Sequence, residues 1–236
     1  MIGAATEPHR SSQRTTRMRT PRLLLTVVAV LGLAACAAPG PAPSPPPEGD
    51  GPLVAFYGDS YTLGTGASDP SLRWSTLVSE ERGWREFNPS VNGLGFVNQR
   101  DGRTDDLVDL IVEQQPDIVI VTMGLNDAFS MDGAAERIRS AIDDDFDRFR
   151  DELPEARLIV SEPFWYLEEA TPESRQVAAW VAESADRVGA ERMEGAATWL
   201  EGGSDEMMAA DGLHPSDTGY KKIAEIMDEG LRELGL

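Results

Sequence analysis

The sequence predicts an α/β protein, a three-layer α/β/α sandwich around a mainly parallel central sheet. Two short runs, Leu53–Tyr57 and Ile118–Met123, are apolar or β-branched throughout, as strands buried on both faces are. Along the chain, such runs alternate with longer stretches of helical pattern. This alternation indicates a parallel sheet, because the helices that connect parallel strands cover both of its faces.

Four strands are expected in chain order, with helices between and after them. The first two are Leu53–Tyr57 and the weaker Arg85–Val91, and the next two are Ile118–Met123 and Arg157–Ser161. The helical stretches lie at about Leu72–Arg82, Asp105–Gln115, Asp132–Leu153, Pro172–Val188 and Asp217–Leu234. The third of these stretches carries apolar residues at three- and four-residue steps, which form one face of a helix.

The composition is that of one soluble globular domain with a strong acidic excess. The 236 residues include 21 Lys and Arg against 41 Asp and Glu, a formal net charge of −20. This balance argues against nucleic acid as a partner, because phosphate backbones are bound by an excess of basic side chains. A single cysteine excludes an intramolecular disulfide framework, a multi-cysteine zinc site and a Cys-x-x-Cys redox pair.

Residues 1–35 are expected to be a signal peptide and not part of the fold. Their basic residues are Arg10, Arg14, Arg17, Arg19 and Arg22. The basic region runs into Leu23–Ala35, which is apolar apart from Thr26 and spans about 20 Å as a helix, against about 30 Å of membrane core. A basic region followed by a short apolar region and small residues is typical of a secretory signal. Met18 is an alternative start that leaves a compact basic region.

The run Leu33-Ala34-Ala35-Cys36 resembles the lipobox of bacterial lipoproteins. The resemblance implies that Cys36 is acylated, becomes the mature N-terminus and holds the protein at an extracytoplasmic membrane surface. The following proline-rich residues favour an extended chain, so residues 36–52 are predicted to be the lipidated cysteine and a tether. Residues 53–236 then form the folded domain.

Polar motifs follow two of the predicted strands and precede the last helix. Ser60 ends the first strand in a glycine-containing turn, where its hydroxyl and backbone N–H are presented as a nucleophile requires. Asn126 follows the third strand, where its side-chain amide could donate to an oxyanion. Because ligand crevices lie beyond the carboxyl ends of parallel strands, we expect both residues at one crevice.

His214 is the candidate general base. The other histidine, His9, lies in the segment expected to be removed, and serine is most often activated by histidine. Asp211 lies three residues before His214 in a glycine-containing loop, where its carboxylate can reach the far ring nitrogen. Asp127 is a rival for this role. The Gly-x-Ser-x-Gly elbow is absent, which disfavours the α/β-hydrolase fold.

These residues resemble the SGNH hydrolase family, also called GDSL esterases and lipases. Its four blocks are matched in order by Ser60 in Gly-Asp-Ser, by Gly93, by Asn126 in Gly-x-Asn-Asp, and by Asp211 and His214 in Asp-x-x-His-Pro. The resemblance implies a flavodoxin-like three-layer sandwich, in agreement with the predicted elements. The second block is the weakest match, and Gly95 is a rival to Gly93 as a backbone donor.

What the resemblance implies is hydrolysis of carboxylic esters, with acyl or acetyl groups as the acid part. Ser60 would attack the ester, His214 would carry the proton and Asp211 would orient the histidine, while Ser60 N–H, Gly93 N–H and the Asn126 amide would hold the oxyanion. No metal or organic cofactor is expected, and the substrate is a small-molecule or glycan-linked ester. An O-acyltransferase acting on glycans and a non-catalytic envelope-binding lipoprotein are the alternatives.

Three other features are interpreted without a direct catalytic role. The acidic run Asp143–Asp145 and Asp147 lacks calcium-loop spacing and is expected to form a solvated helix face. The aromatic run Phe164–Tyr166 follows the fourth strand, where it either packs in the core or rim or walls an acyl or aryl pocket. Asp59 is expected to form the turn and at most to support Ser60.

Overall fold

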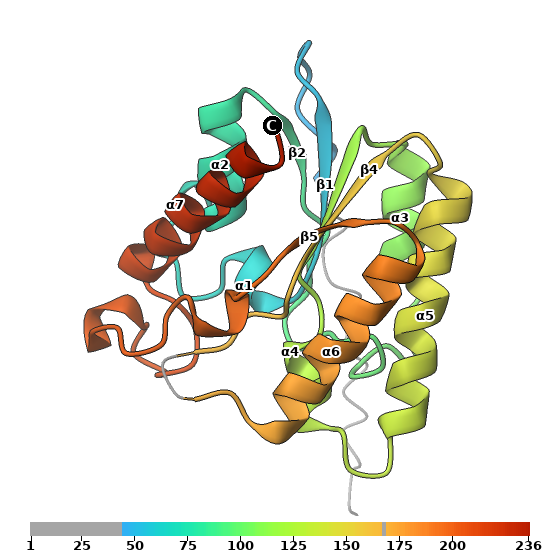
Figure 1. Ribbon diagram of the computed structural model, residues 1–236. Coiled ribbons are helices and arrows are strands. Elements are labelled where there is room, and N and C mark those ends of the chain that lie inside the picture. Colours follow the sequence, from blue (N-terminus) through green and yellow to red (C-terminus); the bar gives the residue numbers. More distant parts are fainter. Residues whose placement is uncertain (1–43, 167–168) are drawn as a thin grey trace, which may run out of the picture. The chain divides into compact units, whose positions relative to one another are not determined.

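The structure, a computed structural model, describes residues 44–166 and 169–236 (Figure 1). In this part of the chain a five-stranded sheet forms the middle layer, with every neighbouring pair of strands parallel and the strand order β2-β1-β3-β4-β5. The strands are β1 (Leu53–Tyr57), β2 (Arg85–Phe87), β3 (Ile118–Val121), β4 (Arg157–Ser161) and β5 (Glu191–Met193). The predicted α/β fold with a parallel sheet is confirmed.

Helices cover both faces of the sheet. On one face, α2 (Trp74–Arg82) packs against α7 (Asp217–Glu233), and on the other α3 (Leu107–Gln114), α5 (Ala135–Glu152) and α6 (Pro172–Arg187) lie side by side (Figure 1). The shorter helices are α1 (Ser60–Leu63), α4 (Leu125–Phe129) and the 3₁₀ turns η1 (Pro70–Leu72), η2 (Ala196–Thr198) and η3 (Asp205–Met207). The five long helices lie where the sequence predicts them.

The ends of the elements differ from the prediction where side chains cap a helix or a proline ends a strand. Helix α3 begins at Leu107 because the Asp106 carboxylate accepts the N–H groups of Val108 and Asp109. Strand β2 ends at Phe87, before Pro89, which has no N–H to give to a sheet. Strand β5 was not predicted, because it is three residues long and polar apart from Met193.

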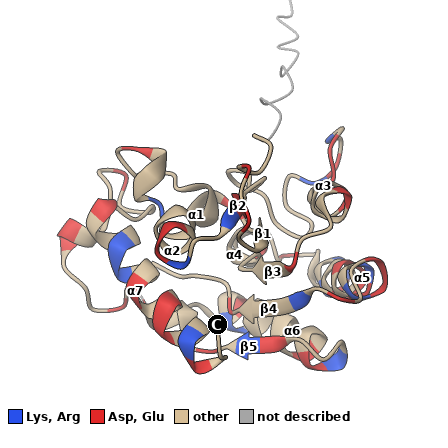
Figure 2. Cartoon of the chain, turned by 90° about the horizontal axis from the view of Figure 1, so that it is seen from above, with Lys and Arg blue, Asp and Glu red and all other residues tan. Residues whose placement is uncertain are grey.

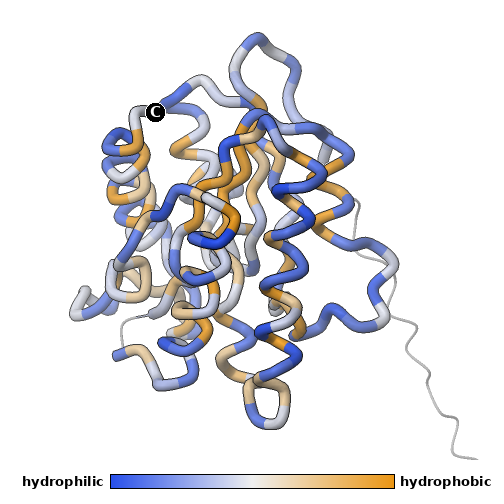
Figure 3. The backbone as a smooth tube through the Cα atoms, turned by 45° about the vertical axis from the view of Figure 1, so that its right-hand side comes forward, coloured by the Kyte–Doolittle hydropathy of each residue, from blue (hydrophilic) through white to orange (hydrophobic). Residues whose placement is uncertain are grey.

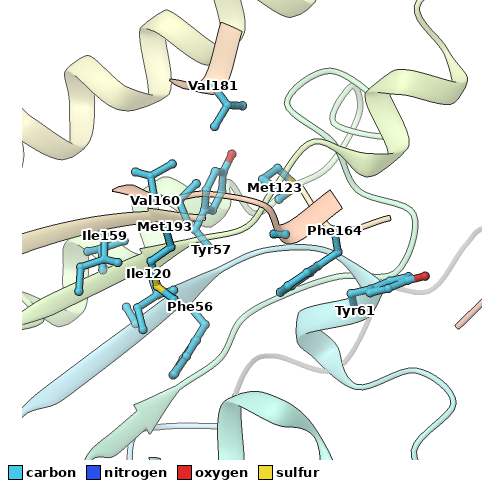
Figure 4. Packing of buried hydrophobic residues seen from close by; sticks show 14 of the residues in the cluster. Phe56, Tyr57, Tyr61, Ile120, Met123, Ile159, Val160, Phe164, Val181 and Met193 are labelled. Carbon is cyan, nitrogen blue, oxygen red and sulfur yellow. The ribbon is translucent and has the colours of Figure 1, made fainter. Parts of the chain in front are cut away.

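Strand β1 is buried on both faces, which explains its continuous apolar sequence. Phe56 contacts Trp74 of α2 edge to face, with ring centres 5.3 Å apart, and Tyr57 contacts Phe149 of α5 with centres 5.2 Å apart. Successive side chains of a strand point to opposite faces, so these two neighbours serve the two halves of the core. The most apolar segments lie in the strands (Figure 3), and the aromatic and aliphatic side chains pack around them (Figure 4).

Charged residues lie mainly on the outer helices (Figure 2), but one acid of α5 is an exception. Asp145 is buried. Its carboxylate accepts a hydrogen bond from the Tyr57 hydroxyl at 2.5 Å and from both terminal nitrogens of Arg100 at 2.6 and 2.7 Å. The expectation of a solvated face is therefore wrong for Asp145. It lies three residues after Ile142 and four before Phe149, which places it within the buried stripe of the helix.

The N-terminal predictions fall mostly outside the described residues. The predicted signal peptide at residues 1–35, Cys36 and the first residues of the predicted tether lie outside the described residues. The last residues of the predicted tether contact the domain, since Arg85 Nε donates to the Gly51 carbonyl at 2.8 Å. Ser44, Pro45 and Pro47 line one side of a cavity of about 540 Å³. Among the described residues, no helix combines the length and apolar character needed to cross a membrane.

We expect the Arg100→Ala variant to lose about 3 kcal/mol of unfolding free energy, because Asp145 would be left as a buried charge without its partner. Urea unfolding followed by circular dichroism measures this loss. The control is Arg137→Ala, whose ion pair with Asp101 is exposed and should contribute less than about 1 kcal/mol. Equal losses in the two variants would show that the buried ion pair contributes no more to the unfolding free energy than the exposed one.

Candidate active site

The loops that carry the candidate residues meet at the carboxyl ends of the central strands. Strand β1 leads directly into the Ser60 turn, and β3 leads into α4, which carries Asn126. The segment after β2 contains Gly93, and the segment before α7 contains Asp211 and His214. Since β1 pairs with both β2 and β3, these connections start from neighbouring positions in the sheet.

Two threonine hydroxyl groups next to Gly58 stabilise the Ser60 turn. The side chains of Thr62 and Thr122 share a hydrogen bond of 2.6 Å. A Cβ at position 58 would lie 2.6 Å from Thr122 Oγ1, so only glycine allows the strand to turn this closely. Asp59 then caps α1 by accepting the Tyr61 N–H at 3.0 Å, and Ser60 begins the helix with its side chain nearly buried.

Two buried tyrosines connect the Ser60 turn to the segments around it. The Tyr61 hydroxyl donates to the Leu213 carbonyl at 2.6 Å, and its ring centre lies 6.1 Å from that of His214. The Tyr220 hydroxyl donates to the Thr65 carbonyl at 2.7 Å. The histidine loop is therefore held beside the serine turn. Sequence reasoning missed both tyrosines, although Tyr61 directly follows the candidate nucleophile.

His214 and Asp211 form a compact unit. Nδ1 of His214 lies 2.7 Å from Asp211 Oδ2, while Asp211 Oδ1 accepts the N–H groups of Leu213 and His214 at 3.0 Å each. The His214 ring and these N–H groups lower the pKa of Asp211 to about 2. Among the described residues, the Ser60 hydroxyl forms no hydrogen bond with His214. Such bonds are often long before a substrate is bound.

The turn at Gly93 presents one unused backbone donor. Gly93 has a φ of 72°, and its carbonyl accepts the Asn98 side-chain amide at 2.6 Å. The Gly95 N–H donates to the Asn98 carbonyl at 2.9 Å, whereas the Gly93 N–H donates to no group among the described residues. Of the two glycines that the sequence leaves as rivals, only Gly93 keeps its N–H free.

Asn126 and Asp127 both face the segment after β2, and among the described residues neither side chain forms a hydrogen bond with His214. The Asn126 amide nitrogen donates to the Leu94 carbonyl at 2.9 Å and to Asp59 Oδ2 at 3.2 Å. The Asp127 carboxylate accepts three backbone N–H groups, those of Phe96, Val97 and Asn98. Burial raises the pKa of Asp127, against the effect of these N–H groups.

Asp59 is the most strongly perturbed carboxyl group at this edge of the sheet. Its side chain is almost fully buried, and burial raises its pKa to about 7, with the nearby Asp127 adding to the effect. The Tyr61 N–H opposes the rise by stabilising the charged form. The carboxyl group nevertheless lies where it can fix both the Ser60 turn and the Asn126 amide, which is more than a turn former requires.

The aromatic run after β4 crosses from the tyrosine side of the site to α4. The Phe164 ring stacks on Tyr61, with centres 5.9 Å apart and planes at 19° (Figure 4). Trp165 is buried and contacts Phe129 of α4 with centres 5.4 Å apart, and it stacks on Tyr166. Phe129 is 56% exposed and covers Trp165 from outside. Phe164 and Trp165 are thus core residues, and Phe129 was not singled out by its sequence.

The side chains and donors at this edge suit one kind of chemistry. A hydroxyl, an imidazole paired with a carboxylate, and backbone and amide N–H groups are the parts used in nucleophilic acyl transfer. In residues 44–166 and 169–236, no three or more His, Cys, Asp or Glu side chains are grouped so as to hold a metal ion.

Solved structures of esterases share this fold. The psychrotrophic esterase EstA from Pseudoalteromonas sp. superposes with a TM-score of 0.61 and 17% identity, over 77% of this chain and 97% of the esterase. A family two carbohydrate esterase from Cellvibrio japonicus superposes with a TM-score of 0.62 and 16% identity, over 79% of this chain and 63% of that protein. The chain therefore shares the α/β/α fold of these solved structures.

The sequence comparison identifies the family. The profile of the GDSL-like Lipase/Acylhydrolase family matches residues 56–222, so the chain belongs to this family. GDSL lipase Rv0518 of Mycobacterium tuberculosis (strain ATCC 25618 / H37Rv) is 26% identical over 181 residues, which cover 73% of this chain and 78% of the relative. The protein is a carboxylic ester hydrolase of the GDSL type.

We expect Asp59→Asn to gain unfolding free energy relative to the wild type as the pH rises from about 4 to 7. The folded pKa of about 7 lies above the ordinary value of 3.8, so between these two pH values the folded wild type holds a proton that the unfolded chain has lost. Stability due to this group is therefore lost as the pH rises through that window. Urea titrations at several pH values measure the difference, and pH-independent differences would contradict the raised pKa.

Proposed function

We propose that the protein hydrolyses carboxylic esters with Ser60 as nucleophile, His214 as general base and Asp211 as the group that orients the histidine. The observation that carries the proposal is the Asp211–His214 pair, with 2.7 Å between the carboxylate and Nδ1, held beside the serine turn by Tyr61. Nδ1–H donates to Asp211, which leaves the lone pair of Nε2 for the serine proton.

The reaction proceeds through an acyl-enzyme. Ser60 Oγ attacks the ester carbonyl while its proton passes to His214 Nε2, and the carbonyl oxygen becomes an oxyanion. Collapse of this intermediate expels the alcohol, which takes the proton from His214. A water molecule then gives a proton to His214 and attacks the acyl group. When this second intermediate collapses, the acid is released and His214 returns the proton to Ser60 Oγ.

Three donors are available for the oxyanion. Ser60 is the first residue of α1. Among the described residues, neither its N–H nor the Gly93 N–H has a hydrogen-bond acceptor. The third is the side-chain amide of Asn126. Its two hydrogen-bond partners are oxygen atoms, so the nitrogen, and not the oxygen, of the amide faces them. To reach the oxyanion, Asn126 exchanges or shares its longer bond, the 3.2 Å contact with Asp59.

The surroundings of the site suit a neutral ester with an apolar or ring-shaped group. The Phe129 ring is exposed one helical turn after Asn126. An exposed aromatic ring of this kind binds acyl chains, aryl groups or sugar rings. The net charge of −20 disfavours anionic substrates. Small-molecule and glycan-linked esters both fit. Transfer of the acyl group to a glycan is tested by product analysis with a sugar acceptor present.

We expect Ser60→Ala and His214→Ala each to bring p-nitrophenyl acetate hydrolysis near background, and the double variant to be little worse than either, because the two residues act as a unit. Asn126→Ala removes one donor of several and should cost roughly 10²–10³ in kcat. Fluorophosphonate labelling should disappear in Ser60→Ala and remain detectable in Asn126→Ala. Unchanged hydrolysis by folded Ser60→Ala would overturn the proposed mechanism.

The cellular location is a further part of the proposal. The lipobox-like run before Cys36 supports lipid anchoring at the outer side of a bacterial cell membrane, with residues 37–52 as the tether. We expect Cys36→Ser to move the protein from the membrane fraction to the soluble fraction or the medium with its esterase rate unchanged. Fractionation and immunoblotting measure this, and full membrane retention of the variant would contradict the anchor.

A further inference from the structure

The Asp127 carboxylate is the centre of a hydrogen-bonded seat for the segment Gly93–Asn98. Its Oδ2 accepts the Phe96 N–H at 2.7 Å, and its Oδ1 accepts the N–H groups of Val97 and Asn98 at 2.9 and 3.1 Å. The side chain is fully buried. Three consecutive N–H groups pointing at one carboxylate fix the backbone of the segment more tightly than single bonds would.

Gly95 is a glycine because of this carboxylate. Its φ is not in the left-handed region, so the backbone itself would accept a side chain. A Cβ at this position, however, would lie 2.6 Å from Asp127 Cγ and 2.5 Å from Oδ1. The close approach of the carboxylate to the backbone, and not the conformation of the turn, excludes larger residues here.

Two more bonds connect the seat to the free donor. The Asn98 side chain donates to the Gly93 carbonyl at 2.6 Å, while its own N–H is held by Asp127. Asn126, next to Asp127 on α4, donates to the Leu94 carbonyl at 2.9 Å. The two peptide groups on either side of Leu94 are therefore tied to α4, directly or through Asn98.

We propose that Asp127 is a positioning residue that orients the Gly93 N–H toward the oxyanion. Its carboxylate packs against Gly95 and so fixes the position of the Gly93 N–H relative to the Asn126 amide. The inference rests on the proposed function, in which both groups stabilise the oxyanion. Asp127 and Asn126 are consecutive on one short helix, so a shift of α4 moves both donors together. A Gly93 N–H held rigidly in this way needs no reorganisation during the reaction.

The first test is Asp127→Asn, which keeps the shape but puts an NH₂ group against at least one backbone N–H. With p-nitrophenyl acetate, kcat should fall roughly 10- to 100-fold, less than for complete removal of a donor, while KM changes less than twofold. The acid limb of the pH–rate profile should stay in place, whereas Asp211→Asn should move it. An unchanged kcat, or a displaced acid limb in Asp127→Asn, would overturn the assignment.

The second test reaches the same contact from the other side and does not depend on Asp127→Asn folding. Gly95→Ala should displace the carboxylate and lower kcat at least tenfold. In the double variant Gly95→Ala/Asp127→Ala the added methyl group should cost nothing beyond Asp127→Ala, because the group it displaces is gone. Gly49→Ala is the control, since its Cβ meets nothing closer than 3.6 Å. If the kcat losses of Gly95→Ala and Asp127→Ala were additive in the double variant, the proposed effect of Gly95 through Asp127 would be contradicted.

These results separate the inference from the proposed function. Fluorophosphonate labelling of Ser60 should be slower in Asp127→Asn, yet complete at long times, because the nucleophile and its base are intact. If Ser60→Ala remained active, the proposed function itself would fail whatever the behaviour of Asp127. If Ser60→Ala were inactive and Asp127→Asn had normal kcat, only the positioning role would be excluded.

Discussion

The candidate site depends on the parallel pairing of β1 with β2 on one side and β3 on the other. In a parallel sheet the carboxyl ends of neighbouring strands lie at one edge, so the segments that leave them are brought together whatever their separation in sequence. The Ser60 turn, the Gly93 turn and α4 all start there. Only the histidine loop comes from elsewhere, and the Tyr61 hydroxyl holds it to the serine turn through the Leu213 carbonyl.

Three buried carboxyl groups shape the domain, and their partners decide what each does. Asp145 is paired with Arg100 and the Tyr57 hydroxyl, so it joins α5 to the sheet. Asp127 is satisfied by backbone N–H groups and holds the segment after β2 in place. Asp59 has fewer donors around it, and its pKa is raised to about 7 by burial. A carboxyl group in that position changes its charge near neutral pH, next to the candidate nucleophile.

Sequence patterns predicted the long elements and, among the short strands, β2 but not β5. Continuous apolar runs located β1, β3 and β4, because strands buried on both faces need apolar residues throughout, and helical patterns located the long helices. Strand β5, with its Glu-Arg-Met sequence, has no such run, since it lies at the sheet edge and owes its conformation to pairing with β4. The same limit applies to Asp145, whose charge suggested solvent although its helical position placed it in the core.

For the site, the sequence alone determined the residue types and their local order: a serine after the first strand, a Gly-x-Asn-Asp motif after the third, and Asp211 three residues before His214. The Asp211–His214 contact was foreseeable because it lies within one short loop. Tertiary structure alone decided that Asp127 faces the backbone of residues 96–98, away from the role of histidine partner, and that the Tyr61 hydroxyl donates to the Leu213 carbonyl. These contacts join segments about 30 residues apart or more, and no local pattern specifies such distances; they are determined by strand order and packing.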